Sequence, residues 1–147
     1  MIKNRGIAAI ENRYKIECIG TGASMPGGPI RFITLSFQVR GALSKQNLRR
    51  MLVTSAQDIL KIANEIPDLD SCLHNPPFGI KSLDILLFVY DVNGRDTYDP
   101  DISSARLSDG IVEFITDAPN CYLKVQNQYT ETYEEALKAI EEEDGLK

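Results

Sequence analysis

The single histidine of this chain limits its options for nucleophilic catalysis. Any Ser-His-Asp or Cys-His scheme must use His74, because the 147-residue sequence contains no second histidine. Cys72 and Asn75 stand close to it in sequence, whereas catalytic partners usually meet through the fold. The two prolines that follow favour a stiffened turn instead. A small hydrolase using His74 therefore stays as an alternative hypothesis.

Acidic residues concentrate in one stretch, where carboxylate oxygens could bind Ca²⁺. The stretch contains Asp91, Asn93, Asp96, Asp99 and Asp101. An EF-hand loop starting at Asp91 would need an oxygen ligand and then Gly where Arg95 and Asp96 stand, and no Glu closes the site. If Asn93-Gly94 forms a two-residue turn, Asp91 and Asp96 lie opposite one another and repel unless solvent, Arg95 or a cation intervenes. A solvated turn is the simpler interpretation, and a calcium-binding surface protein that uses the Asp91–Asp101 loop is the second alternative.

The remaining nucleophiles and glycines form no catalytic or phosphate-binding pattern. Residues 20–24 lack the Lys-Ser/Thr pair of a P-loop, and Pro26 stands where a nucleophile elbow centred on Ser24 needs Gly. Cys18, Cys72 and Cys121 have no metal-ligand spacing. We interpret Cys18 and Cys121 as buried small hydrophobic residues, which could form a bridge if their strands were neighbours. No catalytic, cofactor-binding or metal-ligating residue is assigned, and no cofactor is expected.

The middle third of the chain has clear boundary signals for its elements. Apolar and polar residues alternate from Phe32 to Arg40, as in a half-buried antiparallel strand. Ser44 offers an N-cap to a helix of about residues 45–66, which Pro67 should end. Residues 83–92 are apolar on both faces, which predicts a strand in the middle of a sheet.

Shorter elements flank this region on the N-terminal side. Residues 1–13 are expected to be irregular. A first strand is predicted over residues 14–19, with Tyr14, Ile16 and Cys18 on one side. The Gly- and Pro-containing residues 20–29 should form a flexible loop.

The C-terminal third has three further signals. Asp109-Gly110 predicts a two-residue hairpin, which would place Arg106 opposite Glu113 in a salt bridge. Alternation predicts a strand over residues 121–129. Thr132 and Glu135 form a capping box for a short helix of about residues 133–143.

This order of elements predicts an α+β fold in one domain of residues 1–147. The sheet should be mostly antiparallel with four to six strands, and the helices should lie on one face. The apolar residues of the long helix span about 200° of its circumference, against the roughly 100° that covers one sheet. Either the terminal segments or a homo-oligomer or protein partner must cover the remainder.

Composition excludes several functional classes. The hydrophobic share of 43% and the charged share of 25% are typical of a soluble globular protein. A net charge of −5 disfavours nucleic-acid binding. No apolar run approaches the roughly 20 residues of a membrane helix. We expect a cytoplasmic protein by default, or an exported one if an N-terminal signal has been removed.

Several segments resemble an uncharacterised family of small proteins from intracellular, chlamydia-like bacteria. The segments that carry the resemblance are residues 22–28, Leu43-Ser44-Lys45, Asn75-Pro76-Pro77-Phe78, Asn93-Gly94-Arg95, Asp99-Pro100-Asp101-Ile102 and residues 133–137. The resemblance spans most of the chain from Tyr14 onward. It implies a bacterial origin and is compatible with export, but it supplies no activity and no functional residues.

The sequence therefore favours a small non-enzymatic module for protein interaction. The reasons are the wide apolar arc of the long helix and the lack of a catalytic set. The hydrolase and calcium hypotheses remain as its competitors.

Overall fold

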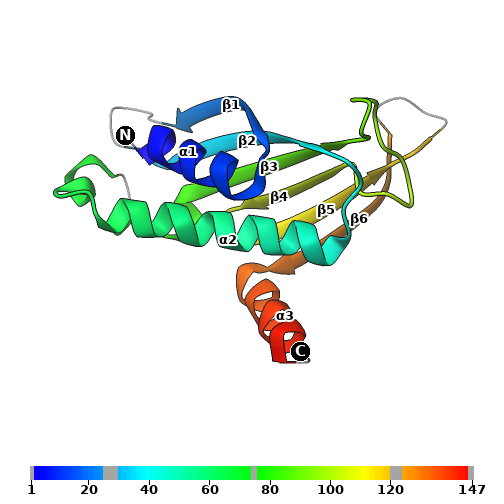
Figure 1. The fold of residues 1–147 in the computed structure, drawn as a ribbon. Helices are drawn as coiled ribbons and strands as arrows, with labels where there is room; N and C mark the ends of the chain where they lie inside the picture. The colour runs from blue at the N-terminus through cyan, green and yellow to red at the C-terminus, as the bar shows by residue number, and fades with distance from the viewer. Residues whose placement is uncertain (1, 25–29, 74–75, 120–123, 146–147) are drawn as a thin grey trace.

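The computed structural model describes residues 2–24, 30–73, 76–119 and 124–145. Within these residues the chain forms three α-helices, six strands and two short 3₁₀ helices (Figure 1). In chain order they are α1 (Ile2–Tyr14), β1 (Glu17–Ser24), β2 (Phe32–Arg40), α2 (Lys45–Asn64), η1 (Leu69–Cys72), η2 (Ile80–Ser82), β3 (Leu83–Tyr90), β4 (Ser104–Ser108), β5 (Ile111–Asp117), β6 (Val125–Thr132) and α3 (Tyr133–Gly145).

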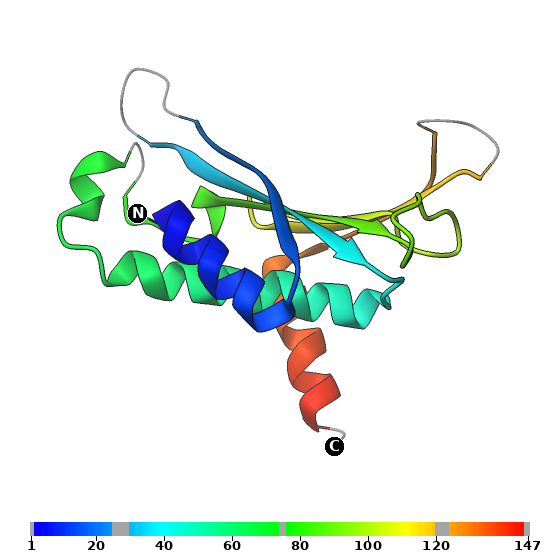
Figure 2. The ribbon, with the colours of Figure 1, turned by 45° about the horizontal axis from the view of Figure 1, so that its top comes forward.

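The six strands form one sheet in the order β1-β2-β3-β4-β5-β6. All neighbours are antiparallel except β2 and β3, which run parallel because α2 connects them. The three helices lie on the same side of this sheet (Figures 1 and 2). The predicted α+β, two-layer fold with a mostly antiparallel sheet is confirmed.

The long helix begins where the sequence predicts and ends slightly earlier. The side chain of Ser44 accepts a hydrogen bond from the Asn47 amide at 3.1 Å, which caps the first turn. The helix ends at Asn64, and Glu65 is its C-cap. The predicted end at residue 66 is thus two residues late, within the usual fraying of a helix terminus.

The apolar arc of α2 is covered within the chain itself. Its buried side chains include Leu48, Leu52, Ala56 and Ile59, each with no exposed surface. One part of the arc faces the sheet, α1 packs against a second part, and α3 packs near the first turns. A Cβ atom on Gly6 would lie 3.3 Å from Cγ1 of Ile59, so α1 approaches α2 closely. The arc therefore supplies no reason for a second chain, contrary to the argument for a homo-oligomer through this helix.

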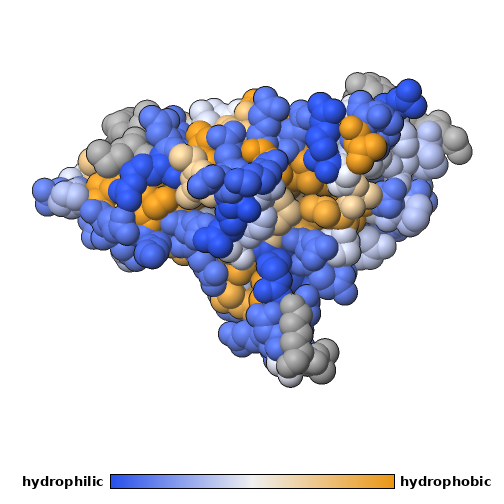
Figure 3. All heavy atoms as spheres, in the orientation of Figure 1, coloured by the Kyte–Doolittle hydropathy of each residue, from blue (hydrophilic) through white to orange (hydrophobic). Residues whose placement is uncertain are grey.

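The helix side of the molecule agrees with this internal covering. In Figure 3 the solvent surface over the helices is mostly hydrophilic, with hydrophobic areas that are small and separate. No described helix is long and apolar enough to cross a membrane.

The N-terminal predictions were wrong. Residues expected to be irregular form α1, and Tyr14, expected in a strand, is its last residue. Ile2, Gly6 and Ile10 recur every four residues and are buried, which is the helical signal that the sequence held. β1 begins only at Glu17 and continues to Ser24, so the first half of the predicted flexible loop is a strand.

The hairpin and the capping box are confirmed. Asp109 and Gly110 have φ angles of 51° and 76°, as a type I′ turn requires. Arg106 lies opposite Glu113 in the register, but its guanidinium pairs with Asp84 instead, at 2.9 Å. The expected salt bridge across the hairpin is therefore replaced by one across β3 and β4.

The last strand and helix follow the prediction closely. β6 begins at Val125 instead of residue 121. Thr132 Oγ1 accepts from the Glu135 amide, and Glu135 Oε1 accepts from the Thr132 amide, both at 3.1 Å. This reciprocal pair starts α3 directly after β6.

Candidate binding surface

The sheet has one face that no described element covers. On this open face the side chains line up in ranks across the strands. The central ranks are Gly22, Thr34, Asp84, Ser108, Ile111 and Thr132; then Gly20, Ser36, Leu86, Arg106, Glu113 and Thr130; then Glu17, Gln38, Phe88, Ser104, Ile115 and Gln128. The opposite face of the same strands carries the buried core. The open face is therefore the largest surface whose covering the described chain does not supply.

Apolar side chains occupy the centre of the open face. Leu86, Phe88 and Tyr90 follow one another along β3, and Ile115 lies two strands away in the rank of Phe88. All four are partly exposed. Small or polar neighbours flank them on β2 and β4, so the two large side chains of the central ranks, Leu86 and Phe88, project beyond their surroundings. An apolar centre with a polar rim is the usual anatomy of a protein interface.

A polar network borders this apolar centre. Asp84 is 6% exposed and accepts from the Arg106 guanidinium at 2.9 and 3.1 Å. Thr34 Oγ1 donates to the same carboxylate at 3.1 Å. The Asp84 charge raises the pKa of Arg106, chiefly through their side-chain hydrogen bond. Since all donors and acceptors are used among themselves, this network positions the strands and holds no free catalytic group.

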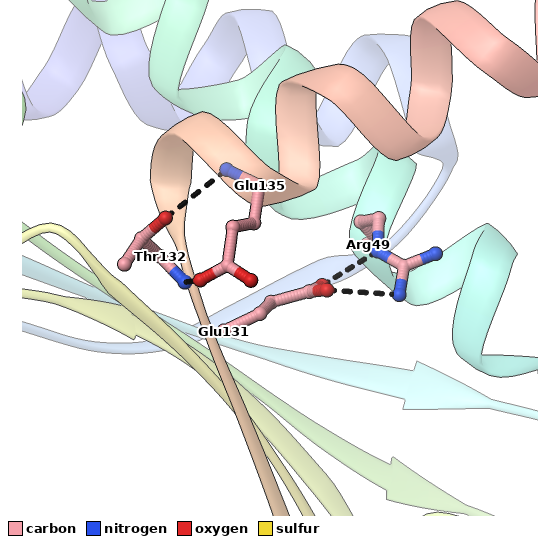
Figure 4. A network of polar contacts seen from close by, with 4 residues as sticks. All are labelled: Arg49, Glu131, Thr132 and Glu135. Carbon is pink, nitrogen blue, oxygen red and sulfur yellow. Dashed lines mark hydrogen bonds and ion pairs between the residues drawn. The ribbon is translucent and has the colours of Figure 1, made fainter.

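A second polar network lies on the covered side of the sheet (Figure 4). Arg49 of α2 donates to Glu131 of β6 at 2.6 and 3.1 Å, and their side chains are only 11% and 17% exposed. The Arg49 guanidinium also stands 5.9 Å from the centroid of the Phe114 ring. The capping box of α3 follows immediately in the chain. This network ties α2 to the last strand and is structural.

A pocket of about 640 Å³ opens between the end of α1, the adjoining ends of β1 and β2, and the first half of α2. Val39 and Met51 contribute apolar surface to it, and Lys15, Arg40 and Arg50 contribute positive charge. Arg50 already pairs with Asp144 at 2.8 Å. Among the described lining residues Glu17 is the one carboxylate, and no Ser, Thr, Cys or His is present. The pocket therefore contains no pair of nucleophile and base.

The acidic loop binds its own backbone. Asp91 Oδ1 accepts from the amides of Asn93 and Arg95 at 2.8 and 2.9 Å. These hydrogen bonds, first that from Arg95, hold the pKa of Asp91 below its usual value. Its backbone amide donates to the Arg95 carbonyl, and Asp96 instead bridges to Tyr90. The predicted opposition of Asp91 and Asp96 is therefore wrong, because the turn contains more than two residues.

The other acidic residues of this stretch do not converge on a metal site either. Asp99 Oδ1 accepts from Thr116 and from Asn127, both at 2.9 Å. No group of three or more possible metal ligands occurs among the described residues. The geometry gives the calcium hypothesis no support.

The remaining candidate residues lie apart from one another. His74, on which the hydrolase hypothesis depends, is outside the described residues, as is Cys121. Cys72 is exposed in η1, and Cys18 is a partly buried free thiol on β1. β1 and β6 form opposite edges of the sheet. The condition for a bridge from Cys18, a neighbouring strand, is not met within the described sheet.

The sequence did hold a signal for the open face. The apolar alternation of β3 on both faces was interpreted as a sign of central position, which is correct. The same pattern also predicted apolar residues on whichever face the helices leave uncovered. Comparisons with known proteins add nothing: no family model, curated protein or solved structure matches this chain.

Proposed function

We propose that this chain is a small non-enzymatic binding module that docks a protein partner on the open face of its sheet. The observation that supports this proposal is the position of Leu86 and Phe88 on the uncovered side of the central strand β3. A strand needs apolar residues on one face to hold the helices. The second apolar face gains its free energy only when another surface covers it.

The chemistry of this face suits a protein surface better than a phosphate backbone. Its arginine, Arg106, is already paired with Asp84. Glu113 and Asp117 add negative charge in the neighbouring strand. Phosphate binding needs unpaired basic residues in a cluster, whereas an apolar centre with hydroxyl and amide groups around it fits a mixed protein surface.

A selection with a random peptide library displayed on phage tests this proposal. Peptides selected on the wild-type chain should lose binding to a Leu86→Ser/Phe88→Ser variant, because the apolar anchors are gone. The matched control is Val92→Ser, which removes the most exposed large apolar side chain among the described residues, at 76%, away from the open face.

The control variant should bind the selected peptides as the wild type does. The proposal fails if the peptides keep their affinity for the Leu86→Ser/Phe88→Ser variant, or if their NMR shift changes map to the pocket beside Met51. Thermal unfolding of each variant verifies that it is folded before binding is compared.

A further inference from the structure

The outer edge of β6 offers free backbone hydrogen-bonding groups. β6 is the last strand of the sheet, and no described element pairs with its outer side. The Tyr133 amide donates to the Gly110 carbonyl at 2.9 Å, one step beyond the pair of Ile111 and Thr132. Bonded and non-bonded pairs alternate along an antiparallel ladder. Tyr129 therefore bonds inward to β5, as Tyr133 does.

The residues between the inward-bonding ones direct their amides and carbonyls outward. These are Gln128 and Thr130 in the regular part of β6. Thr132 has the same parity, and its amide is indeed free of the sheet, because it donates to Glu135 of the capping box. Gln128 and Thr130 are exposed, so their backbone groups are available to another strand.

This edge lacks the usual protection against strand pairing. β6 reads VQNQYTET, without proline or lysine. Its one charged residue, Glu131, is neutralised by Arg49 from the helix layer. Natural proteins protect edges with lysine, proline, bulges or a covering element. The regular part of β6 from Asn127 onward has none of these.

The opposite edge of the same sheet is protected. The outer strand β1 contains an irregularity between Cys18 and Gly20. Its Cys18 amide donates to the Glu11 carboxylate of α1 at 2.9 Å. The chain therefore blocks one edge and leaves the other open, which indicates that the open edge has an occupant.

We infer that the occupant is a second copy of this chain, paired antiparallel through β6 about a two-fold axis at Tyr129. In this register Gln128 of each copy bonds to Thr130 of the other, and both residues use their outward groups. The edge meets itself without repulsion because its charge is already neutralised. Tyr129, which is 46% exposed, meets its own counterpart on the helix side.

Pairing in this way joins the two sheets into one continuous sheet and places the two open faces side by side. A contact made mainly by one strand from each copy buries less than the roughly 1,600 Å² of a standard interface. We therefore expect association at high micromolar protein, with exchange between monomer and dimer. This inference goes beyond the proposed function and does not depend on it.

The test is amide hydrogen exchange by NMR on the full chain, from micromolar to millimolar concentration, together with sedimentation velocity. Exchange at Gln128 and Thr130 should slow several-fold as concentration rises, because only dimer formation satisfies these amides. Exchange at Tyr129, already bonded to β5, should stay slow throughout. Fast exchange at Gln128 and Thr130 in a chain that sediments as a monomer at every concentration overturns the inference.

Two charge-matched variants separate the edge from the open face. Gln128→Lys/Thr130→Lys places lysine opposite lysine in both cross-copy pairs and should abolish association. Ser104→Lys/Ser108→Lys adds the same charge to the same face on the internal strand β4 and should leave it intact. Association lost only in the β4 variant assigns the contact to the face. Protection of Gln128 and Thr130 only on addition of a selected peptide assigns the edge to an extended partner. Either result overturns the second-copy assignment.

Discussion

The two faces of β3 have similar hydropathy but different surroundings. Leu83, Ile85, Leu87 and Val89 point toward the helices and are at most 2% exposed. Leu86, Phe88 and Tyr90 point the other way and have only their neighbours on the same face. Apolar residues on the covered face hold the fold, whereas those on the open face contribute little to it. Their presence is therefore better explained by binding than by stability.

The largest expected effect is on the covered face. Leu87→Ala removes a fully buried side chain from the centre of the core and should lower the free energy of unfolding by about 2–5 kcal/mol. Urea unfolding followed by circular dichroism measures this loss. The neighbouring Leu86→Ala on the open face is the matched control and should cost far less. Equal losses would mean that both faces are covered in the folded chain.

The ion pair on the covered side should matter next. Glu131→Ala leaves the Arg49 guanidinium poorly solvated between α2 and the sheet, so we expect a loss of about 2–3 kcal/mol, below the value for a fully buried pair. Replacing both partners, as in Arg49→Met/Glu131→Leu, should recover most of that loss because no unpaired charge remains. Failure of the double variant to recover stability would show that the pair itself, rather than its desolvation, supports the fold.

The corresponding ion pair on the open face should be worth less. Asp84→Ala frees Arg106, whose side chain is 47% exposed and can turn to solvent. We expect a loss of about 1–2 kcal/mol, mainly from the hydrogen bonds to Asp84. Denaturant unfolding of Asp84→Ala and Glu131→Ala under the same conditions compares the two sides directly. A larger loss for Asp84→Ala would reverse the contrast between the faces.

The sequence predicted features that depend on neighbours in the chain. Ser44, the Asp109-Gly110 turn and the Thr132/Glu135 box each act within a few residues, so their types alone indicate the structure. Features that depend on tertiary contacts were missed. Gly6 serves α1 only because Ile59 lies against it, and the parallel pairing of β2 with β3 depends on where α2 returns the chain.

The candidate site was harder to predict for the same reason. The apolar pattern of Leu86 and Phe88 is visible in the sequence, but it does not say which face of β3 the helices cover. The width of the α2 arc suggested a partner, yet α1 fills that place. Only the assembled layers show that the uncovered apolar residues belong to the sheet.

A direct change on the open face should have little effect on stability. Phe88→Ser removes a partly exposed ring whose neighbours are Gln38 and Ser104, so unfolding should change by no more than about 1 kcal/mol. Binding of the selected peptides should nevertheless fall. A large loss of stability without loss of peptide binding would mean that Phe88 belongs to the core and not to the binding surface.

The smallest effect is expected just beyond the open face, at the end of β3. Backbone amides hold the pKa of Asp91 below its ordinary value, so its ionised form is favoured in the folded state. That contribution is present above the unfolded pKa, near 3.8, and is lost as pH falls through the lower folded value. Asp91→Asn should therefore be slightly less stable than the wild type at neutral pH, and the difference should shrink in strong acid. Urea unfolding at both pH values measures it, with the exposed Asp101→Asn as control; a difference that grows on acidification would contradict the role of the Asn93 and Arg95 amides.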